Sequence, residues 1–265
     1  MQYCKTLKED IIKFINNNEH YIEFNSNKSF FNNLKTKYSF PNRNVYTCEQ
    51  CHDDDLFLSI DLKKANFQAL KFFHNGIFLS CNTYEEYMRK FTDLQYIIDS
   101  KDTRQYILGN LNSKRTVAIE KFIMDTILDS KTLQTHLLPY YDVFSVNSDE
   151  IILKFKKDIK NTEQYQIDNC DWIKKSIKDE NRVDVKVSKF KLKVHEFKSV
   201  FSDNVIRVFE KYDVLGDEKN TLKCVPITYY TQIYKLIKGL EVTKEDLVFY
   251  YEHELSSFLE PLIKL

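Results

Sequence analysis

The chain has 265 residues, of which 43% are hydrophobic, so it can bury the core of one large domain or two small ones. Its 39 basic and 39 acidic residues give a formal net charge of zero, which argues against binding nucleic acid through bulk positive charge but leaves room for a local basic surface. Glycine and proline number only four each, so glycine-rich phosphate-binding loops are not expected.

The sequence also indicates an intracellular location. No apolar run approaches the roughly 18 residues that a membrane span requires. The N-terminal stretch MQYCKTLKEDIIKF has the pattern of a charged amphipathic helix and not that of a signal peptide. Six scattered cysteines are typical of free thiols in a reducing compartment. We therefore expect a protein of the cytoplasm or nucleus, or of a viral replication site in a host cell, without membrane association.

The first half of the chain predicts helices around one buried strand. Apolar periodicity predicts helices over residues 4–17 and 27–38. The apolar run LFLSI, residues 56–60, has an aspartate on each side and predicts a buried strand, and a helix is expected directly after it, over residues 62–73. Residues 83–130 are predicted to be helical almost throughout.

The second half predicts strands and further helices. Residues 141–155 are expected to form a hairpin with its tip at NSDE. A helix is predicted near residues 161–178, alternating strands from Val183 onward, and a second hairpin that turns at GDEKN. Two final helices are expected, divided at Gly239, the second capped by Thr243.

This order of elements predicts an α+β fold, because helices lie between strands that can pair antiparallel. We expect an antiparallel, palm-like sheet with helices packed on one face, and helical N- and C-terminal parts. The expected organisation is an N-terminal helical segment (1–47), a core with a helical insertion at 83–130 (48–200), and a C-terminal hairpin with helices (201–265).

Carboxylates stand at two predicted strand ends. Asp61 follows the buried strand, and Asp149 with Glu150 forms part of the hairpin tip. Phosphoryl transfer by in-line displacement is served by two metal ions about 4 Å apart. Mg²⁺ prefers oxygen ligands, and strand ends hold such ligands more rigidly than loops do. The pattern therefore predicts a magnesium site built from carboxylates at these strand ends.

These residues resemble motifs of a polymerase palm domain. The stretch DLKKANFQALKFF is similar to motif A, most like that of family A DNA polymerases and secondly that of reverse transcriptases. VFSVNSDEIILKF is similar to family A motif C, and SKRTVAIEKFIMDTIL to the helix that precedes it. The likeness covers roughly residues 55–155. The chain departs from family A in having Ser148 before the acidic pair and in lacking the fingers signature.

The resemblance implies that Asp61 and Asp149 are the metal ligands and that Glu150 is a further catalytic carboxylate. It also implies which residues contact the substrate. Asn66 stands where such enzymes contact the sugar, and four basic residues are candidates to contact triphosphate or backbone phosphates: Lys63, Arg104, Lys114 and Arg115. The implied cofactor is Mg²⁺, as two ions. The implied partners are nucleoside triphosphates and nucleic acid, DNA in preference to RNA. Because the chain lacks the fingers signature, a further implied partner is a protein that supplies this element.

Each of these residues also has an ordinary structural interpretation. Asp61 can be the N-cap of the helix that follows it. Asp149 and Glu150 can be turn residues of a hairpin. The basic residues can form a solvated helix face.

A cysteine and histidine cluster suggests a second kind of site. Cys48, Cys51 and His52 form CEQCH, which has the spacing of haem attachment and of half a zinc site. Haem attachment belongs to oxidising compartments, and a zinc site needs two more ligands, for which His74 and Cys81 are the candidates. Free thiols are the default expectation, and zinc is not expected.

Three functions remain open on the sequence alone. The first is a palm-type nucleotidyltransferase that extends a nucleic-acid strand by two-metal phosphoryl transfer. The second is a non-catalytic nucleic-acid-binding replication accessory. The third is a viral or microbial interaction protein without catalysis.

Overall fold

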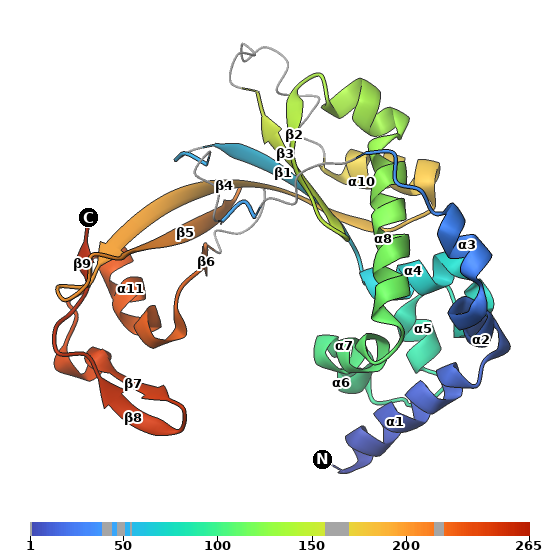
Figure 1. The fold of residues 1–265 in the computed structure, drawn as a ribbon, viewed down its shortest axis with the longest axis horizontal. Coiled ribbons are helices and arrows are strands. Elements are labelled where there is room, and N and C mark those ends of the chain that lie inside the picture. The colour runs from blue at the N-terminus through green and yellow to red at the C-terminus, as the bar shows by residue number, and fades with distance from the viewer. Residues whose placement is uncertain (1, 39–43, 47–50, 54, 157–169, 215–219) are drawn as a thin grey trace. The chain divides into compact units, whose positions relative to one another are not determined.

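The computed structural model describes residues 2–38, 44–46, 51–53, 55–156, 170–214 and 220–265 (Figure 1). The chain divides into two compact units. The first comprises residues 1–42, 59–152 and 156–187, and the second comprises residues 43–58, 153–155 and 188–265. In the described part of the chain, no helix is long and apolar enough to cross a membrane.

These units differ from the segments expected from the sequence. The N-terminal helices group with the first unit, and the expected boundary between residues 200 and 201 lies inside the second. The central strands β1 (Leu56–Leu62), β3 (Glu150–Phe155) and β4 (Val185–Lys198) each contribute residues to both units.

Within the described residues, the larger sheet has seven strands in the order β2-β3-β1-β4-β5-β6, with β9 also paired to β4. The additional strands are β2 (Tyr141–Val146), β5 (Val205–Asp213), β6 (Thr221–Lys223) and β9 (Ile263–Lys264). The sheet is mostly antiparallel and helices flank it, so the expected α+β class is confirmed.

The first four strands follow a β-α-β-β-α-β order along the chain. The helices between β1 and β2 are α4 (Ala65–Phe73), α5 (Tyr84–Met88), α6 (Gln95–Ile98), α7 (Lys101–Gly109) and α8 (Ser113–Leu128). Between β3 and β4 lies α10 (Cys170–Asn181), and α8 packs against both α4 and α10 (Figure 1). With the spatial order β2-β3-β1-β4, this is the split β-α-β arrangement, in which the first strand lies in the middle of the sheet.

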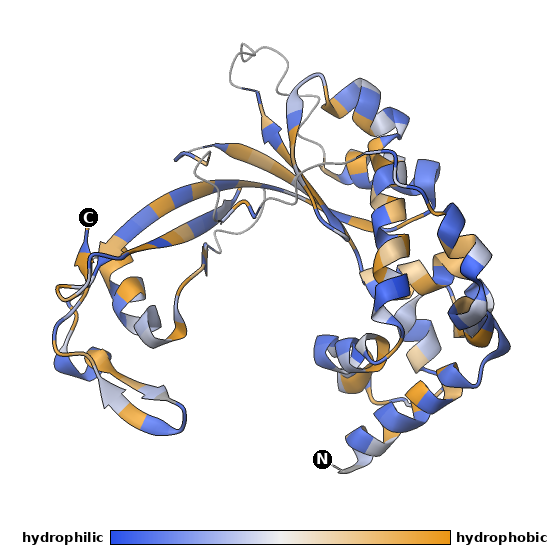
Figure 2. Cartoon of the chain, viewed as in Figure 1, coloured by the Kyte–Doolittle hydropathy of each residue, from blue (hydrophilic) through white to orange (hydrophobic). Residues whose placement is uncertain are grey.

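The strand β1 is buried because it is apolar on both sides. Leu58 and Ile60 are fully buried on one side of the strand, and Phe57 and Ser59 are buried on the other. Figure 2 shows the apolar character of this strand, and the alternation of apolar and polar residues along β4. Because β1 continues through Leu62, α4 begins later than the sequence predicts, at Ala65.

The N-terminal region forms three helices. They are α1 (Gln2–Asn16), α2 (Glu19–Ser26) and α3 (Lys28–Asn33). The first was expected; the second was not, and the third is shorter than the predicted helix over 27–38. Asn18 caps α2 and also donates from Nδ2 to the Gly76 carbonyl at 3.1 Å, in the short helix η1 (Asn75–Phe78). There the rings of His20 and His74 stack with centroids 3.7 Å apart.

The second unit has its own core. Phe197, Val208, Ile233 and Leu262 form a buried cluster between the outer part of the sheet and α11 (Tyr230–Ile237). The hairpin predicted over residues 204–227 is confirmed in its strands, β5 and β6, whereas residues 215–219, which include most of its predicted turn, lie outside the described residues.

The second of the two predicted C-terminal helices is wrong. Thr243 does cap a helical turn, η5 (Lys244–Leu247), but the chain then forms a hairpin of β7 (Val248–Tyr251) and β8 (Glu254–Ser257). Its two loop residues, Glu252 and His253, have φ angles of 49° and 72°. Two consecutive positive φ values are those of a type I′ turn, which suits the twist of a two-residue hairpin.

Left-handed backbone conformations recur at non-glycine residues. Among the described residues, Gly239 is the single glycine with a positive φ. The non-glycine residues with positive φ are Lys64, Leu79, Ser80, Arg182, Cys224, Glu252 and His253. Such conformations cost L-residues free energy, so each marks a corner that its surroundings enforce.

Candidate active site at the strand ends

The C-terminal end of β1 lies between the first residues of β3 and β4. The backbone N–H of Leu62 donates to the Asp149 carbonyl at 2.8 Å, and the N–H of Lys63 donates to the Asp184 carbonyl at 2.9 Å. Both neighbours therefore run antiparallel to β1 at this end. The end of β1 and the start of β3, which are far apart in the sequence, therefore lie side by side, and each carries a carboxylate.

The register of these bonds determines which side chains share a face. Leu62 is bonded to Asp149, so in antiparallel register the preceding residue of β1, Asp61, lies opposite the following residue of β3, Glu150. On the other side of β1, Lys63 is bonded to Asp184, and the same register places Asp61 opposite Lys186. Ser59 lies on the same face as Asp61, and its hydroxyl donates to Glu150 Oε1 at 2.6 Å. The carboxylate directly across from Asp61 is therefore Glu150.

Asp61 does not cap the helix that follows it. It is the next-to-last residue of β1 and is half-buried, whereas the N-cap position of α4 is Lys64. The ordinary interpretation of Asp61 as an N-cap is thus wrong.

Asp149 belongs to the turn between β2 and β3. The N–H of Asn147 donates to the Glu150 carbonyl at 2.8 Å, which closes the hairpin that the sequence predicts. Asp149 accepts a weak hydrogen bond from the Ser148 hydroxyl at 3.4 Å. Because Asp149 stands just before the strand, strand alternation does not determine the direction of its side chain. The turn interpretation is correct for the backbone, and through its carbonyl Asp149 lies beside the end of β1.

A fourth carboxyl group, Glu120 of α8, was not identified from the sequence. Its side chain is 4% exposed, and it makes no hydrogen bond or ion pair with any described residue. Burial, and secondarily the negative charge of Asp149, raises the pKa of Glu120 to about 7. Thr116, Glu120 and Met124 form one buried stripe at helical spacing. A glutamate at a position of the helix that faces the core is the sequence signal that could have identified this residue.

The donor chemistry at the strand ends suits a hard cation. Asp61 and Glu150 carry carboxylates on adjacent strands, and Asp149 carries one in the turn before β3. Among the described residues, no three His, Cys, Asp or Glu side chains converge closely enough to hold one metal ion. Magnesium sites commonly use one or two carboxylates and complete their shell with water and substrate phosphates, so a pair of carboxylates satisfies this requirement.

The zinc candidates are only partly described. Cys48 lies outside the described residues. Cys51 and Cys81 are buried and form no disulfide with a described residue. Within the part of the chain that the structure describes, neither His52 nor His74 belongs to a group of three or more side chains that could hold a metal ion.

The predicted basic residues fall in different places. Arg115 donates to the Phe24 carbonyl and lies over the Phe31 ring at 4.4 Å, so it binds α8 to the N-terminal helices. Arg104 lies over the ring of Tyr84 at 5.9 Å. Lys114 is exposed in the first turn of α8. Of the four, Lys63 follows Asp61 most closely in the chain, and its side chain is exposed.

The N-terminus of α4 lies immediately after Asp61. Lys64 has a φ of 52° and makes no capping hydrogen bond with its side chain. The N–H groups of Ala65 and Asn66 have no hydrogen-bond acceptor among the described residues. A helix start with open N–H groups attracts phosphate, so this turn can receive an anion beside the strand-end carboxylates.

Comparison of the chain with known proteins gives no assignment. Neither a protein-family model, nor a curated protein, nor a solved structure matches it.

Proposed function

We propose that this protein is a palm-type nucleotidyltransferase that extends a nucleic-acid strand with nucleoside triphosphates. The observation that carries the proposal is the hydrogen bond from Leu62 to the Asp149 carbonyl, because it joins the two carboxylate-bearing strand ends in one sheet. The β-α-β-β-α-β order, with β1 central, supports the same conclusion.

The chain's own residues would divide the work as follows. Asp61, with Asp149 or Glu150, would hold Mg²⁺ through carboxylate oxygens. The bound ion would supply charge neutralisation at the attacking and leaving oxygens. The open N–H groups of α4 would orient the triphosphate by donating hydrogen bonds to its oxygens. Ser59 holds the Glu150 carboxylate in one orientation through its hydroxyl, which keeps this ligand preorganised.

The test is primer extension by the full chain. Purified protein is incubated with a primed DNA template, the four deoxynucleotides and Mg²⁺ or Mn²⁺. The wild type should extend the primer, and Asp61→Asn should reduce the rate by roughly a hundredfold or more, because the substitution removes a charge that holds the metal. A parallel reaction with an RNA template and ribonucleotides identifies the preferred substrate.

Asp142→Asn is the matched control. Asp142 is an exposed aspartate on β2 of the same sheet, where it pairs with Lys156 at 3.6 Å, and its loss should leave extension unchanged. Extension by the Asp61→Asn protein at the wild-type rate would contradict the role of Asp61. A wild type that is inactive on every template would contradict the proposal as a whole.

One observation favours a second candidate function, a non-catalytic nucleic-acid-binding accessory. Lys186 lies opposite Asp61 on β4, and an ammonium group there competes with a metal ion for the carboxylate. Binding of DNA that weakens steeply with salt, without extension, would support this function.

A further inference from the structure

A pocket of about 600 Å³ opens in the first unit, on the α4 side of the β1 corner. Its walls come from three segments: α4 with the corner before it, the turn into α5, and the connection between α10 and β4. Residues from all three line it, including Lys63, Phe67, Lys71, Phe72, Tyr84 and Arg182. A volume of this size suits a small organic ligand.

The pocket carries an excess of positive charge. Lys63 and Arg182 have exposed side chains that make no ion pair with any described residue, and Lys71 donates to the Asn82 carbonyl at 2.8 Å without a carboxylate partner in the described part of the chain. The other charges on its walls are balanced. Lys64 pairs with Glu85, and Asp184 pairs with Lys178 at 2.8 Å.

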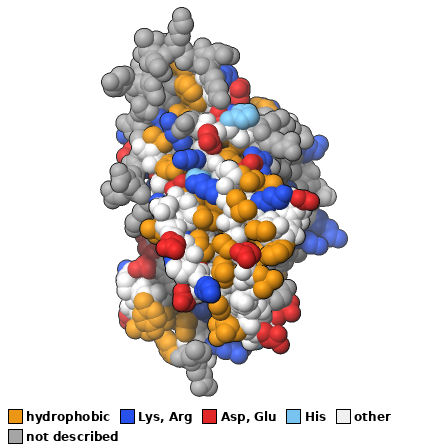
Figure 3. All heavy atoms as spheres, turned by 90° about the vertical axis from the view of Figure 1, so that its left-hand side faces the viewer, with side chains coloured by type: hydrophobic (Ala, Val, Ile, Leu, Met, Phe, Trp, Pro, Cys, Tyr) orange, Lys and Arg blue, Asp and Glu red, His pale blue; other side chains and the backbone are white. Residues whose placement is uncertain are grey.

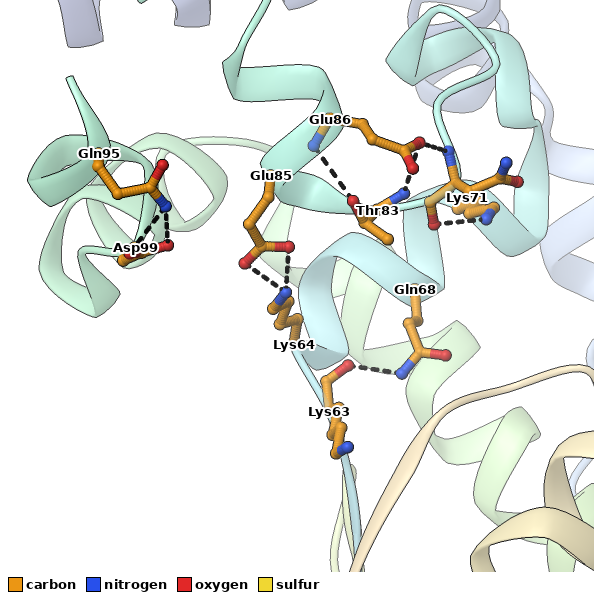
Figure 4. A network of polar contacts seen from close by, with 10 residues as sticks. Lys63, Lys64, Gln68, Lys71, Thr83, Glu85, Glu86, Gln95 and Asp99 are labelled. Atoms are coloured by element: carbon orange, nitrogen blue, oxygen red, sulfur yellow. Dashed lines mark hydrogen bonds and ion pairs between the residues drawn. The ribbon is translucent and has the colours of Figure 1, made fainter. Parts of the chain in front are cut away.

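Polar contacts hold the walls in place. Figure 4 shows that the Gln68 amide reaches the Lys63 carbonyl, while Glu86 is directed at the backbone of Thr83. The Gln68 side chain also donates to the Asp184 carbonyl at 2.7 Å and accepts from the Asp184 N–H at 2.7 Å. One glutamine thus joins the β1 corner to the β4 corner, so the pocket is formed before any ligand arrives.

Two walls of the pocket include strained corners. Lys64 and Arg182 have φ angles of 52° and 58°, which glycine or asparagine would adopt at lower cost. At Arg182 the strained residue is also an exposed cation without an ion-pair partner among the described residues, so its guanidinium is available to a ligand in the pocket.

The pocket also offers apolar surface beside these cations. Phe72 is 44% exposed, and Phe67 is 3% exposed. An inorganic anion would leave most of the volume empty, and an apolar ligand would leave the cations unpaired. A planar ring with an attached phosphate satisfies both surfaces.

From these features we infer that the pocket binds a nucleoside phosphate, with its ring against Phe72 and its phosphate at Lys71 and Arg182. The ligand is either a free nucleotide or the phosphorylated 5′ end of a strand, which present the same group. This site does not require metal and stands whether or not the strand-end carboxylates catalyse.

The test is a fluorescence titration of the full chain with N-methylanthraniloyl-AMP in EDTA, which excludes metal-dependent binding at the strand ends. Saturable binding is expected. Arg182→Asn and Lys71→Gln should each weaken it about tenfold, because each removes a charge-assisted contact. Asparagine tolerates a positive φ, so Arg182→Asn should unfold at the same or a higher denaturant concentration, which separates lost binding from lost folding.

Lys175→Gln on α10 is the matched control, because Lys175 is an exposed lysine outside the pocket. Competition by unlabelled AMP, by a 5′-phosphorylated oligonucleotide and by its 5′-hydroxyl form identifies the source of the phosphate. Absence of saturable binding with both nucleotide and phosphorylated strand would overturn the inference. Equal weakening in the Lys175→Gln protein, or equal competition by adenosine or by an acidic peptide, would overturn it as well.

Discussion

At the scale of single residues, Glu120 lies in surroundings that favour its neutral form. It is buried on α8, lacks a hydrogen-bond partner among the described residues, and experiences the negative charge of Asp149. A buried glutamate without a partner is costly when ionised, so its place beside the strand ends is a feature that packing alone does not explain.

This environment predicts a pH-dependent stability. The folded-state pKa of Glu120 is about 7, above the unfolded value of 4.5, so its contribution to stability is fully present below pH 4.5 and is lost as the pH rises through 7. Glu120→Gln should remove that loss. In denaturant unfolding at a series of pH values, the free energy of unfolding of the variant should rise relative to that of the wild type between pH 4.5 and 7, by at most about 3 kcal/mol.

The control is Glu241→Gln, at an exposed position of the second unit. That protein should follow the wild-type pH profile. Parallel profiles for wild type and Glu120→Gln would contradict the prediction and show that Glu120 ionises equally easily in the folded and unfolded states.

The sequence indicated part of this site and missed part of it for a physical reason. The strand ends that carry Asp61, Asp149 and Glu150 were predicted because strand ends are visible in apolar runs, and Leu56–Ile60 is such a run. The pairing of Asp61 with Glu150 and Lys186 depends on register, which apolar runs do not encode. Lys64 and Arg182 take left-handed conformations without the glycine or asparagine that would signal them.

At the scale of elements, helix and strand assignments succeeded where one period dominated. The β2–β3 hairpin and α8 were predicted, although the buried stripe of α8 runs through Thr116 and Glu120 and leaves Val117 and Phe122 half-buried. The β7–β8 hairpin was mistaken for a helix because its turn, Glu252-His253, lacks the usual Asn-Gly signal, while its aromatic residues also fit a helical spacing.

The contact between α2 and η1 predicts a sensitive glycine. A Cβ added to Gly76 would lie 2.2 Å from the His20 ring, which already stacks on His74. Gly76→Ala should therefore displace His20 and disturb the hydrogen bond from Asn18 to the Gly76 carbonyl. The free energy of unfolding should fall by roughly 1–3 kcal/mol. Urea unfolding measures the loss, and amide hydrogen exchange should localise it to α2.

Gly109→Ala provides the comparison. Gly109 lies at the end of α7, and a Cβ there meets no atom within 4 Å. Alanine should be neutral or stabilising by up to about 1 kcal/mol, since it favours the helix. Equal destabilisation by both substitutions would mean that space at Gly76 is not the cause.

At the scale of the whole molecule, the surface is mixed in charge and carries exposed apolar side chains. Figure 3 shows apolar side chains between charged groups of both signs on one face, consistent with the formal net charge of zero. In the second unit, Ile227 is 89% exposed and Leu259 is 81% exposed. Side chains so exposed contribute little to folding.

Leu259→Ser should accordingly change the free energy of unfolding, measured in urea, by less than about 0.5 kcal/mol. Leu262 is the matched comparison, because it is 4% exposed within the core cluster of the second unit. Leu262→Ser should cost roughly 2 to 5 kcal/mol, the range for truncating a buried leucine. Similar losses for the two variants would place Leu259 in the core under solution conditions.

The left-handed corners have a consequence for engineering this protein. With four glycines in 265 residues, the chain turns many of its corners with residues that adopt such angles reluctantly. Asparagine or glycine at Ser80 or Cys224 would relieve this reluctance and raise the melting temperature without touching a carboxylate or the pocket. Because the chain has so few glycines, single substitutions at these positions offer a direct route to a more thermostable protein.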